Sequence, residues 1–395
     1  MDISINEFIK RHINDDPAKL RLKYHGDNEA MNAVLQLECR RKTSSKLNMT
    51  LRFEDFLFPT SLSAEQCTSD DLAAFHASLI NPGSNVIDMT CGLGIDTFHI
   101  ARCGCHVTAL EKEPAVAMCA RHNAEVLGLE SYVDIINADS VTWLEEQSGR
   151  TDVIFIDPAR RGEGGRRLYS LSDCAPDILG ILSLLRSRCN KLIVKASPML
   201  DISALSESLC PYLKDLYITG SQRECKELVA VMDFRTEIKE DVKIHVVTGS
   251  KEAFCFTAKE EKDASIMESM PEPGDIIHEP WAVTMKSGAF RILASRYGLD
   301  SISHDTHLYH AATDNPEFPG RRYAIIDVLP FNKQGIKKAV SITEGHAEVS
   351  ARNFGMKSEQ LAERLRIRQS GELRIWGVRD TKADRYIIVG RKKEV

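Results

Sequence analysis

Residues 86–97 read VIDMTCGLGIDT, an apolar stretch that ends on Asp88 and runs into Gly92 and Gly94. This order predicts a strand, a tight turn and a helix, because glycine lacks the Cβ that would block the close approach of a ligand. The free N–H groups at such a helix start bind anions. A dinucleotide-binding turn would need a third glycine, where this chain has Thr97, and Asp88 would repel a pyrophosphate. The turn instead favours a ligand that carries a positively charged amino group.

The composition bounds the kind of protein. The chain has 395 residues, which is too long for one ordinary core and predicts two or more domains. No apolar run approaches the roughly 18–20 residues of a membrane span, and the N-terminus lacks the apolar region of a signal peptide. Eleven cysteines, with no C-x-x-C pair, predict reduced thiols in a cytoplasm rather than a disulfide framework. We therefore expect a cytoplasmic protein without a membrane segment.

The charge is unevenly distributed along the chain. The net charge is −6, yet the segment from residue 320 to 395 holds 17 Lys and Arg against 9 Asp and Glu. The rest of the chain is correspondingly acidic. Such asymmetry predicts a polyanion-binding appendage on an acidic enzyme. A solvated basic surface without a partner is the alternative.

Between residues 63 and 236, apolar β-branched runs alternate with amphipathic helices, which indicates a parallel sheet covered on both faces. The seven strand candidates are NVIDM, HVTALE, VDIIN, DVIFID, KLIVKA, DLYITG and ELVAVMDF. The last two are joined by only SQREC, too short for a crossover helix, so they should pair antiparallel. The helix candidates include PAVAMCARHNAEVLG, SVTWLEEQ, CAPDILGILSLLRSR and ISALSESLC.

Three further regions flank this sheet. Residues 1–62 are expected to be helical. Residues 237–318 suggest a strand extension, KIHVVTG and AFCFTA, then a small α+β domain of ferredoxin-like type in which WAVTMKSGAFRILASRYG forms a helix. Residues 319–395 are expected to form a second small, basic α+β domain with strands RRYAIIDVLPF, GELRIWGV and DRYIIVGR and the helix EQLAERLRI.

Asp88, Gly92 and Gly94 form a D-x-x-x-G-x-G pattern that resembles the first motif of class I S-adenosylmethionine-dependent methyltransferases. In that family a glycine usually stands at the position of Thr90. The other family motifs follow in order, each at the end of the next strand candidate, where open α/β sheets bind their ligands. The resemblance implies a Rossmann-like, seven-stranded methyltransferase sheet, parallel with one antiparallel strand, and S-adenosylmethionine as the cofactor.

The same resemblance assigns roles to individual residues. Glu111 in TALEKE would bind the ribose hydroxyls of the cofactor, and Asp139 in INADS its adenine amino group. Asp157 in FIDPAR would face the transferred methyl group. The cofactor-binding candidates are therefore Gln66, Thr68, Asp88, Thr90, Gly92, Gly94, Glu111, Asp139 and Asp157.

The segment DPAR resembles the fourth motif of nucleic-acid methyltransferases, with two departures. Amino-group methylases carry an aromatic residue at the position of Arg160, where it stacks on a flipped base. The 5-methyluridine enzymes use a cysteine after the fifth strand as nucleophile, and Ala196 stands there in IVKASPM. A cysteine adduct is therefore excluded, and Cys91 is interpreted as a packing residue. Direct transfer to nitrogen or oxygen remains, with Asp157, Pro158, Arg160 and Lys195 as the catalytic candidates.

From about residue 30 onward, the chain resembles a bacterial family of class I methyltransferases with a C-terminal THUMP-like domain. The segments that carry this resemblance are SLSAEQCTSDDLAAFHA, DMTCGLGIDTFHIA, IFIDPARR, VKASPMLDI, HEPWAVTMKSGAF and FPGRRYAIIDVLPFN. THUMP domains bind tRNA in RNA-modifying enzymes, so the resemblance implies an RNA partner, tRNA or rRNA. The basic C-terminal segment supports it independently. The RNA-binding candidates are Arg161, Arg166 and Arg167 beside the methyl site, and Arg321, Arg322, Lys337, Lys338, Arg364, Arg366 and Arg368.

Three hypotheses remain open. The first is an RNA methyltransferase, the second a small-molecule or protein methyltransferase whose C-terminal unit only shapes the pocket, and the third a catalytically inactive RNA-binding relative.

Three histidines suggest a metal site, because His304, His307 and His310 lie three residues apart. No fourth ligand is spaced nearby, so no metal is predicted.

Overall fold

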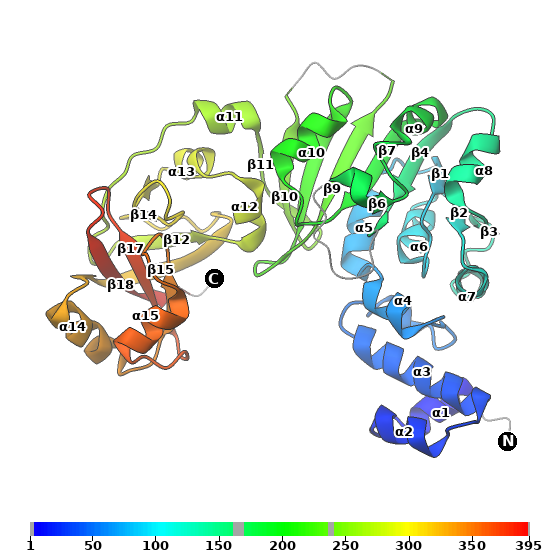
Figure 1. Cartoon of the computed structure of the whole chain (residues 1–395), viewed down its shortest axis with the longest axis horizontal. Coiled ribbons are helices and arrows are strands. Elements are labelled where there is room, and N and C mark those ends of the chain that lie inside the picture. Colours follow the sequence, from blue (N-terminus) through cyan, green and yellow to red (C-terminus); the bar gives the residue numbers. More distant parts are fainter. Residues whose placement is uncertain (1–3, 161–169, 236–240, 394–395) are drawn as a thin grey trace. The chain divides into compact units, whose positions relative to one another are not determined.

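A computed structural model describes residues 4–160, 170–235 and 241–393 (Figure 1). The chain forms two compact units. The first comprises Met1–Leu216 and Glu227–Glu240, and the second Tyr217–Lys226 and Asp241–Val395. Among the helices of the described ranges, none is long and apolar enough to span a bilayer.

The N-terminal region is helical, as expected. Its helices are α1 (Ile5–Arg11), α2 (Pro17–Lys23), α3 (Asn28–Thr43), the 3-10 turn η1 (Thr50–Arg52), α4 (Ser61–Gln66) and α5 (Asp70–Ser78) (Figure 1). Ser4, Asp16 and Asp27 each cap one of the first three helices, because their side chains accept a hydrogen bond from a backbone N–H of the first turn. A small apolar core holds these three helices together and consists of Phe8, Leu20, Ala33, Val34 and Leu37.

The large sheet has nine strands in the order β11-β10-β8-β9-β7-β4-β1-β2-β3. Neighbours from β7 to β3 run parallel, and β9 is antiparallel to β7, which confirms the Rossmann-like class. The strands are β1 (Asn85–Asp88), β2 (His106–Glu111), β3 (Val133–Asn137), β4 (Thr151–Ile156), β7 (Cys189–Ala196), β8 (Leu213–Gly220), β9 (Cys225–Asp233), β10 (Lys243–Thr248) and β11 (Lys251–Thr257).

This sheet differs from the expected seven strands at one edge. The antiparallel hairpin β10–β11, predicted as a strand extension, continues the sheet beyond β8. A physical reason is that an edge strand exposes unpaired N–H and C=O groups, which the hairpin covers. The expected antiparallel partners DLYITG and ELVAVMDF are neighbours in the sheet, as β8 and β9.

The helices between the strands are α6 (Ile95–Arg102), α7 (Pro114–Val126), α8 (Ser140–Glu146), α9 (Leu182–Arg188) and α10 (Ile202–Leu209). One expectation was too long: CAPDILGILSLLRSR is helical only from Leu182. Its start, β6 (Cys174–Ala175), pairs with β5 (Ala159–Arg160) instead. Pro176 accounts for the non-helical Ala175, since a residue before proline avoids the helical conformation. Residues 178–181 form turns before α9 begins.

The second unit contains a seven-stranded sheet with the order β13-β14-β12-β15-β18-β17-β16. Its strands are β12 (Ile276–Pro280), β13 (Asp300–Ser301), β14 (Tyr309–Ala311), β15 (Gly320–Pro330), β16 (Glu348–Ala351), β17 (Leu373–Arg379) and β18 (Arg385–Lys392). Its helices are α11 (Ala258–Asp263), α12 (Ala282–Ser287), α13 (Arg291–Tyr297), α14 (Lys333–Thr343) and α15 (Ser358–Leu365).

The helix expected over WAVTMKSGAFRILASRYG is wrong as one element. It is split into α12 and α13 at Gly288, whose left-handed φ of 78° ends α12. The strands expected over RRYAIIDVLPF, GELRIWGV and DRYIIVGR are confirmed as β15, β17 and β18, and EQLAERLRI as α15. The fully buried Trp376 and Ile388 belong to the apolar core of this sheet.

Candidate functional site

Asp88 stands at the carboxyl end of β1 and is almost wholly buried, with 1% of its surface exposed. Its Oδ2 accepts a hydrogen bond from the Thr97 hydroxyl at 2.6 Å, and its Oδ1 accepts one from the Thr90 N–H at 2.9 Å. Burial raises the pKa of Asp88 to about 7. Thr97, the residue that argued against a dinucleotide turn, therefore anchors the carboxylate that begins the turn.

The two glycines of the turn have the left-handed backbone that the sequence implied. Gly92 has a φ of 54° and Gly94, the N-cap of α6, a φ of 89°. A Cβ on Gly94 would lie 2.5 Å from Cζ of Phe98. A side chain at this position would therefore be strained twice, by its backbone and by its neighbour. The turn leaves close backbone access at the start of α6, where N–H groups point outward.

Glu111 ends β2 and touches the same turn. Its Oε2 accepts a hydrogen bond from the Gly92 N–H at 3.0 Å, and its Oε1 one from the Glu113 N–H at 2.8 Å. Asp139 follows β3, is exposed and caps α8. Hydrogen bonds from the backbone of Thr142 and Val141 lower the pKa of Asp139, so it is a carboxylate at neutral pH. Both acids thus lie at the carboxyl ends of neighbouring strands, as predicted.

Asp157 follows β4 and joins the fourth-strand motif to the first. Its backbone N–H donates to the Thr90 hydroxyl at 2.7 Å. Its side chain is 43% exposed and accepts a hydrogen bond from the buried ammonium of Lys195, on β7, at 2.7 Å. Lys195 also donates to the Thr68 hydroxyl at 2.8 Å. The structure therefore brings Thr68, Thr90, Asp157 and Lys195 together, while Gln66 is exposed at the end of α4.

Behind Lys195 lies a buried group of charges that the sequence analysis did not identify. Asp96 and Glu227 place carboxylate oxygens 3.3 Å and 3.6 Å from the Lys195 nitrogen. His76, with no exposed surface, lies 2.7 Å from each of these two carboxylates through its two ring nitrogens. We name His76, Asp96, Asp157, Lys195 and Glu227 the ionic cluster.

The charge states of the ionic cluster follow from its contacts. Burial alone would lower the pKa of His76, but Glu227 and Asp96 raise it to about 9. Burial likewise opposes the charge on Lys195, yet Asp157, Asp96 and Glu227 hold its pKa well above the usual range. The pKa of Asp96 is well below its usual range, against burial, because of Lys195 and His76. Against the effect of burial, Lys195 and His76 also lower the pKa of Glu227, so two cations face the carboxylates of Asp96 and Glu227 at neutral pH.

A sequence signal for this cluster exists in retrospect. Charged residues are almost never fully buried unless paired. Lys195 interrupts the apolar strand KLIVKA, and Glu227 opens the apolar run of ELVAVMDF. Each of these two residues thus indicates a buried partner of opposite charge. The partners could not be identified from the sequence, because the cluster residues come from α5, α6, β7 and β9, which meet only in the folded chain.

Two further catalytic candidates follow Asp157 in the chain. Pro158 is half-buried, and the backbone of Arg160 lies in β5, opposite Cys174. Arg161, Arg166 and Arg167 lie outside the described residues. Cys91 is 7% exposed, and burial raises its pKa well above the ordinary value, so it is a neutral thiol.

The basic C-terminal candidates differ in exposure. The assignment of Arg322 to RNA binding is wrong. Its side chain is buried and donates a hydrogen bond to Asp314 at 2.8 Å, so it is not a surface contact for RNA. The reason is that β15 is covered on both faces here, since the neighbouring Tyr323 is buried as well. Arg321 beside it is half-buried. The candidates with exposed side chains are Lys337 and Lys338 on α14, Arg364 on α15, and Arg366 and Arg368 just after it.

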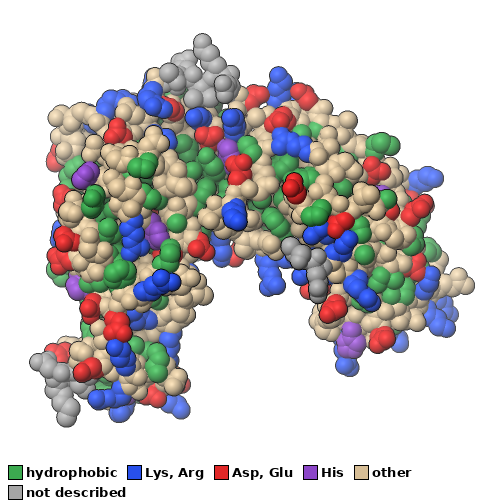
Figure 2. Space-filling model, turned by 180° about the vertical axis from the view of Figure 1, so that it is seen from behind, with side chains coloured by type: hydrophobic (Ala, Val, Ile, Leu, Met, Phe, Trp, Pro, Cys, Tyr) green, Lys and Arg blue, Asp and Glu red, His purple; other side chains and the backbone are tan. Residues whose placement is uncertain are grey.

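Pairing reduces the free charge of this basic segment. Lys338 is 2.5 Å from Asp327. Arg364 lies over the ring of Phe331, with 5.3 Å between guanidinium and ring centre. In Figure 2, Lys and Arg side chains are spread over the visible face among acidic and apolar ones. On this face the basic side chains therefore do not form one continuous positive patch.

The three histidines near residue 307 have separate partners. His304 is exposed and pairs with Asp305 at 2.9 Å, and His307 stacks on Phe290 at 3.9 Å. His310 is buried and lies 3.3 Å from Asp275.

A cavity of about 310 Å³ lies away from all predicted sites. It is lined by residues at the amino ends of the strands of the large sheet, such as Asn85, His106 and Tyr132.

Three family profiles match the chain. Residues 33–160 match a family described as "Putative SAM-dependent methyltransferase". Residues 277–319 match a ferredoxin-like domain, and residues 320–392 a THUMP domain-like family.

Two relatives match over most of their length. An uncharacterized S-adenosylmethionine-dependent methyltransferase of Mycobacterium tuberculosis (strain CDC 1551 / Oshkosh) is 25% identical, and the match covers 85% of this chain and 89% of that protein. The crystal structure of a "putative methyltransferase" from Porphyromonas gingivalis W83 is 26% identical with a TM-score of 0.85, and covers 99% of this chain and 98% of that chain. A shorter match is ribosomal RNA small subunit methyltransferase J of Cronobacter sakazakii, 38% identical over 18% of this chain and 32% of that protein.

Proposed function

Because the chain is an S-adenosylmethionine-dependent methyltransferase with a C-terminal THUMP-like domain, we propose that it methylates RNA, tRNA or rRNA, by direct transfer to nitrogen or oxygen. The observation that carries the proposal is the meeting of Asp157, Thr90 and Lys195 at the carboxyl edge of the sheet. The eleven cysteines, all described and none in a disulfide, support a location in the cytoplasm.

The residues at this edge fit the cofactor. Gly92 and Gly94 take left-handed φ values at the start of α6, and a Cβ on Gly94 would clash with the ring of Phe98. Glu111 offers a carboxylate to ribose hydroxyls beside that turn, and Asp139 offers one to an amino group after the next strand. When bound, S-adenosylmethionine supplies an electrophilic methyl group on its sulfonium. Asp88 holds the turn through Thr90 and Thr97, and we assign the cofactor's amino acid end to this turn.

A covalent thiol route has no support at this edge. Ala196 ends β7 where a nucleophilic cysteine would stand, and Cys91 is a buried, neutral thiol. The remaining task for the protein is to position the nucleophile in line with the methyl group. Asp157 suits this task because Lys195 holds one carboxylate oxygen, while the side chain is still open enough to accept a hydrogen bond from a substrate N–H or O–H.

The proposed RNA contacts lie in the basic C-terminal segment. Lys337, Lys338, Arg364, Arg366 and Arg368 expose their side chains there. Phosphate contacts from Lys and Arg position a nucleic acid without reading its sequence. We therefore assign these residues to RNA capture and leave the choice of nucleotide to the methyl site.

The deciding experiment compares modified nucleosides in total RNA, by mass spectrometry, between a strain that lacks the gene and its parent. Loss of one methylated nucleoside is expected, and purified protein with labelled cofactor should restore it on RNA from the deletion strain. The Asp157→Asn variant is the control, since it should bind the cofactor and fail to restore the mark. Unchanged nucleosides with methylation of a small molecule or protein would favour the second hypothesis. RNA binding without any transfer would favour the inactive relative.

A further inference from the structure

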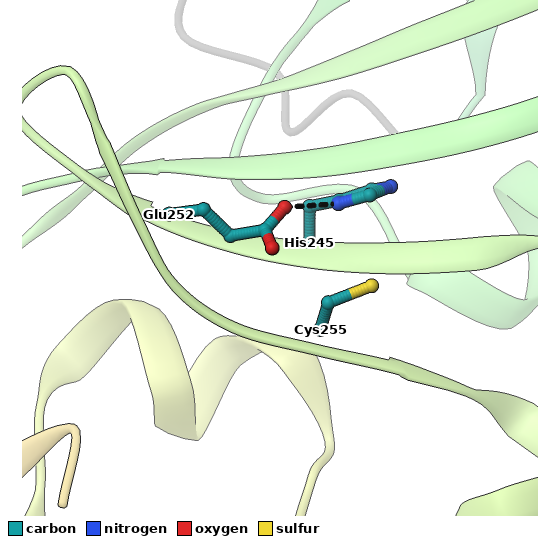
Figure 3. A group of neighbouring side chains, drawn as sticks. All are labelled: His245, Glu252 and Cys255. Atoms are coloured by element: carbon teal, nitrogen blue, oxygen red, sulfur yellow. Dashed lines mark hydrogen bonds and ion pairs between the residues drawn. The ribbon is translucent and has the colours of Figure 1, made fainter. Parts of the chain in front are cut away.

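Three metal-binding side chains meet on the hairpin β10–β11, away from the histidines that the sequence analysis considered. They are His245 on β10 and Glu252 and Cys255 on β11, and their ligand atoms all lie within 4.8 Å of one another. In Figure 3 the Glu252 carboxylate and the His245 ring face each other, with the Cys255 thiol beside them. Within the described ranges this is the group of three that meets such a spacing.

A β-bulge explains how three residues reach one face. His245 and Cys255 are cross-strand partners, so they point to the same side of the hairpin. In a regular strand Glu252, three residues before Cys255, would point to the opposite side. The register shifts between Val246 and Val247, so Glu252 pairs with Val247 and returns to the face of His245. Bulges often re-aim a side chain next to a functional site.

Neighbouring contacts hold the imidazole in place. His245 is buried, and its ring stacks on Tyr217, with 4.4 Å between the ring centres. Its Nδ1 lies 2.5 Å from Glu252 Oε2. Glu252 is exposed and Cys255 partly so, which leaves a route from solvent to the group. Contacts that fix the orientation of an imidazole are typical of histidines that bind metals.

We propose that His245, Glu252 and Cys255 bind a divalent transition metal, with Zn²⁺ the best match. An imidazole nitrogen, a carboxylate oxygen and a thiolate are the donors that Zn²⁺ accepts, and the hard ions Mg²⁺ and Ca²⁺ avoid sulfur. Three protein ligands leave a fourth position for water. Donors about 2.0–2.3 Å from zinc lie about 3.5 Å apart. The Glu252 carboxylate, now 2.5 Å from Nδ1 of His245, must therefore move outward by about 1 Å to admit the ion, which its exposed position allows. Binding releases the thiol proton of Cys255.

The ion would join β10 to β11 at the edge of the large sheet. Because metal binding to a folded site adds to folding stability, the hairpin should become more stable when zinc is present. This inference does not depend on the methyl acceptor, since it concerns residues of the second unit and not the ionic cluster.

The test uses the full chain, stripped of metal by a chelator and titrated with Co²⁺, then with Zn²⁺ as competitor. A thiolate-to-cobalt charge-transfer band is expected with one equivalent, and Zn²⁺ should remove it. Cys255→Ser should abolish the band, and Glu252→Gln should weaken binding about tenfold or more. The matched control is Cys210→Ser, which removes an exposed thiol elsewhere and should leave the band unchanged.

A second readout guards against loss of fold. Circular dichroism should be the same for the wild type and for Glu252→Gln without metal, and Zn²⁺ should raise the melting temperature of the wild type but not that of Cys255→Ser. A band that survives Cys255→Ser, or a wild-type chain that binds no Co²⁺, would overturn the proposal. If Cys210→Ser lost the band equally, the band would come from other thiols, and the proposal would be overturned as well.

Discussion

Lys195 holds Asp157 at 2.7 Å, and this single contact links a buried cation to an exposed carboxylate at the carboxyl edge of the sheet. Lys195 is 6% and Asp157 43% exposed at the side chain. The buried partner is fixed from behind by Asp96 and Glu227. Asp157 is thus aimed by residues that cannot touch a substrate themselves.

Asp157→Asn should reduce methyl transfer by about 10²-fold, because the amide no longer accepts a substrate hydrogen bond as a carboxylate does. Cofactor affinity should stay within a few-fold, as measured by calorimetry. Full turnover in this variant would show that Asp157 has no part in the reaction.

Lys195→Met should lower both turnover and stability, because it leaves the buried carboxylates of Asp96 and Glu227 with His76 as the one remaining cation of the ionic cluster. Breaking a buried pair in this way costs about 3–5 kcal/mol. The control is Lys191→Met on the same strand, where the half-buried Lys191 donates to the Leu79 carbonyl. Lys195→Met should have a lower free energy of unfolding, measured by chemical denaturation, and a lower turnover than Lys191→Met. Equal effects would mean that Lys195 matters only as a long side chain.

His76 predicts a loss of stability in mild alkali. Its pKa is raised to about 9 in the folded protein, against about 6.5 in the unfolded chain. Its contribution is therefore fully present below pH 6.5 and is lost as the pH rises through 9; at about 1.4 kcal/mol per pKa unit it amounts to roughly 3 kcal/mol. His76→Gln should flatten the free energy of unfolding over this window. His304→Gln, at an exposed position, should keep the wild-type slope.

Glu111→Ala should weaken cofactor binding by roughly 1–3 kcal/mol, because ribose hydroxyls and the Gly92 N–H lose an acceptor. Glu113→Ala, two residues along, is the matched control and should bind normally. Calorimetry with S-adenosylmethionine and with NAD distinguishes a methyltransferase cofactor site from a dinucleotide site. Tight NAD binding by the wild type, without S-adenosylmethionine binding, would contradict the site.

RNA affinity should depend on charge in the C-terminal segment. Reversing Arg364 and Arg368 together to Glu should weaken RNA binding and leave cofactor affinity unchanged. Log affinity should fall linearly with log salt, with a slope near −0.7 for each phosphate neutralised on single strands. The control reverses Lys19 and Lys23 on α2, which changes net charge equally. Equal losses in the two variants would mean that net charge, not this segment, binds RNA.

Substitution of Cys91, Cys174 or Cys189 by Ala should leave turnover within a few-fold, since direct transfer needs no thiol nucleophile. An RNA containing 5-fluorouridine should give no covalent adduct on denaturing gels. A trapped adduct would restore the cysteine mechanism.

The sequence by itself determined the strand–turn–helix at Asp88, the alternating strands of the large sheet and the acids at their ends. It did so because apolar runs, strand-end carboxylates and Gly92 and Gly94 act through local conformation. Local rules also failed where one residue overrides a pattern. Gly288 split one expected helix, and Pro176 shortened another.

Only the tertiary structure decided which charges meet. His76, Asp96, Lys195 and Glu227 come from four elements, and their contacts depend on sheet order. Whether an arginine faces solvent depends on what packs against its strand, as Arg322 and its partner Asp314 show. A bulge set the face of Glu252 on the hairpin with His245. Each of these follows from non-local packing, which spacing along the chain does not encode.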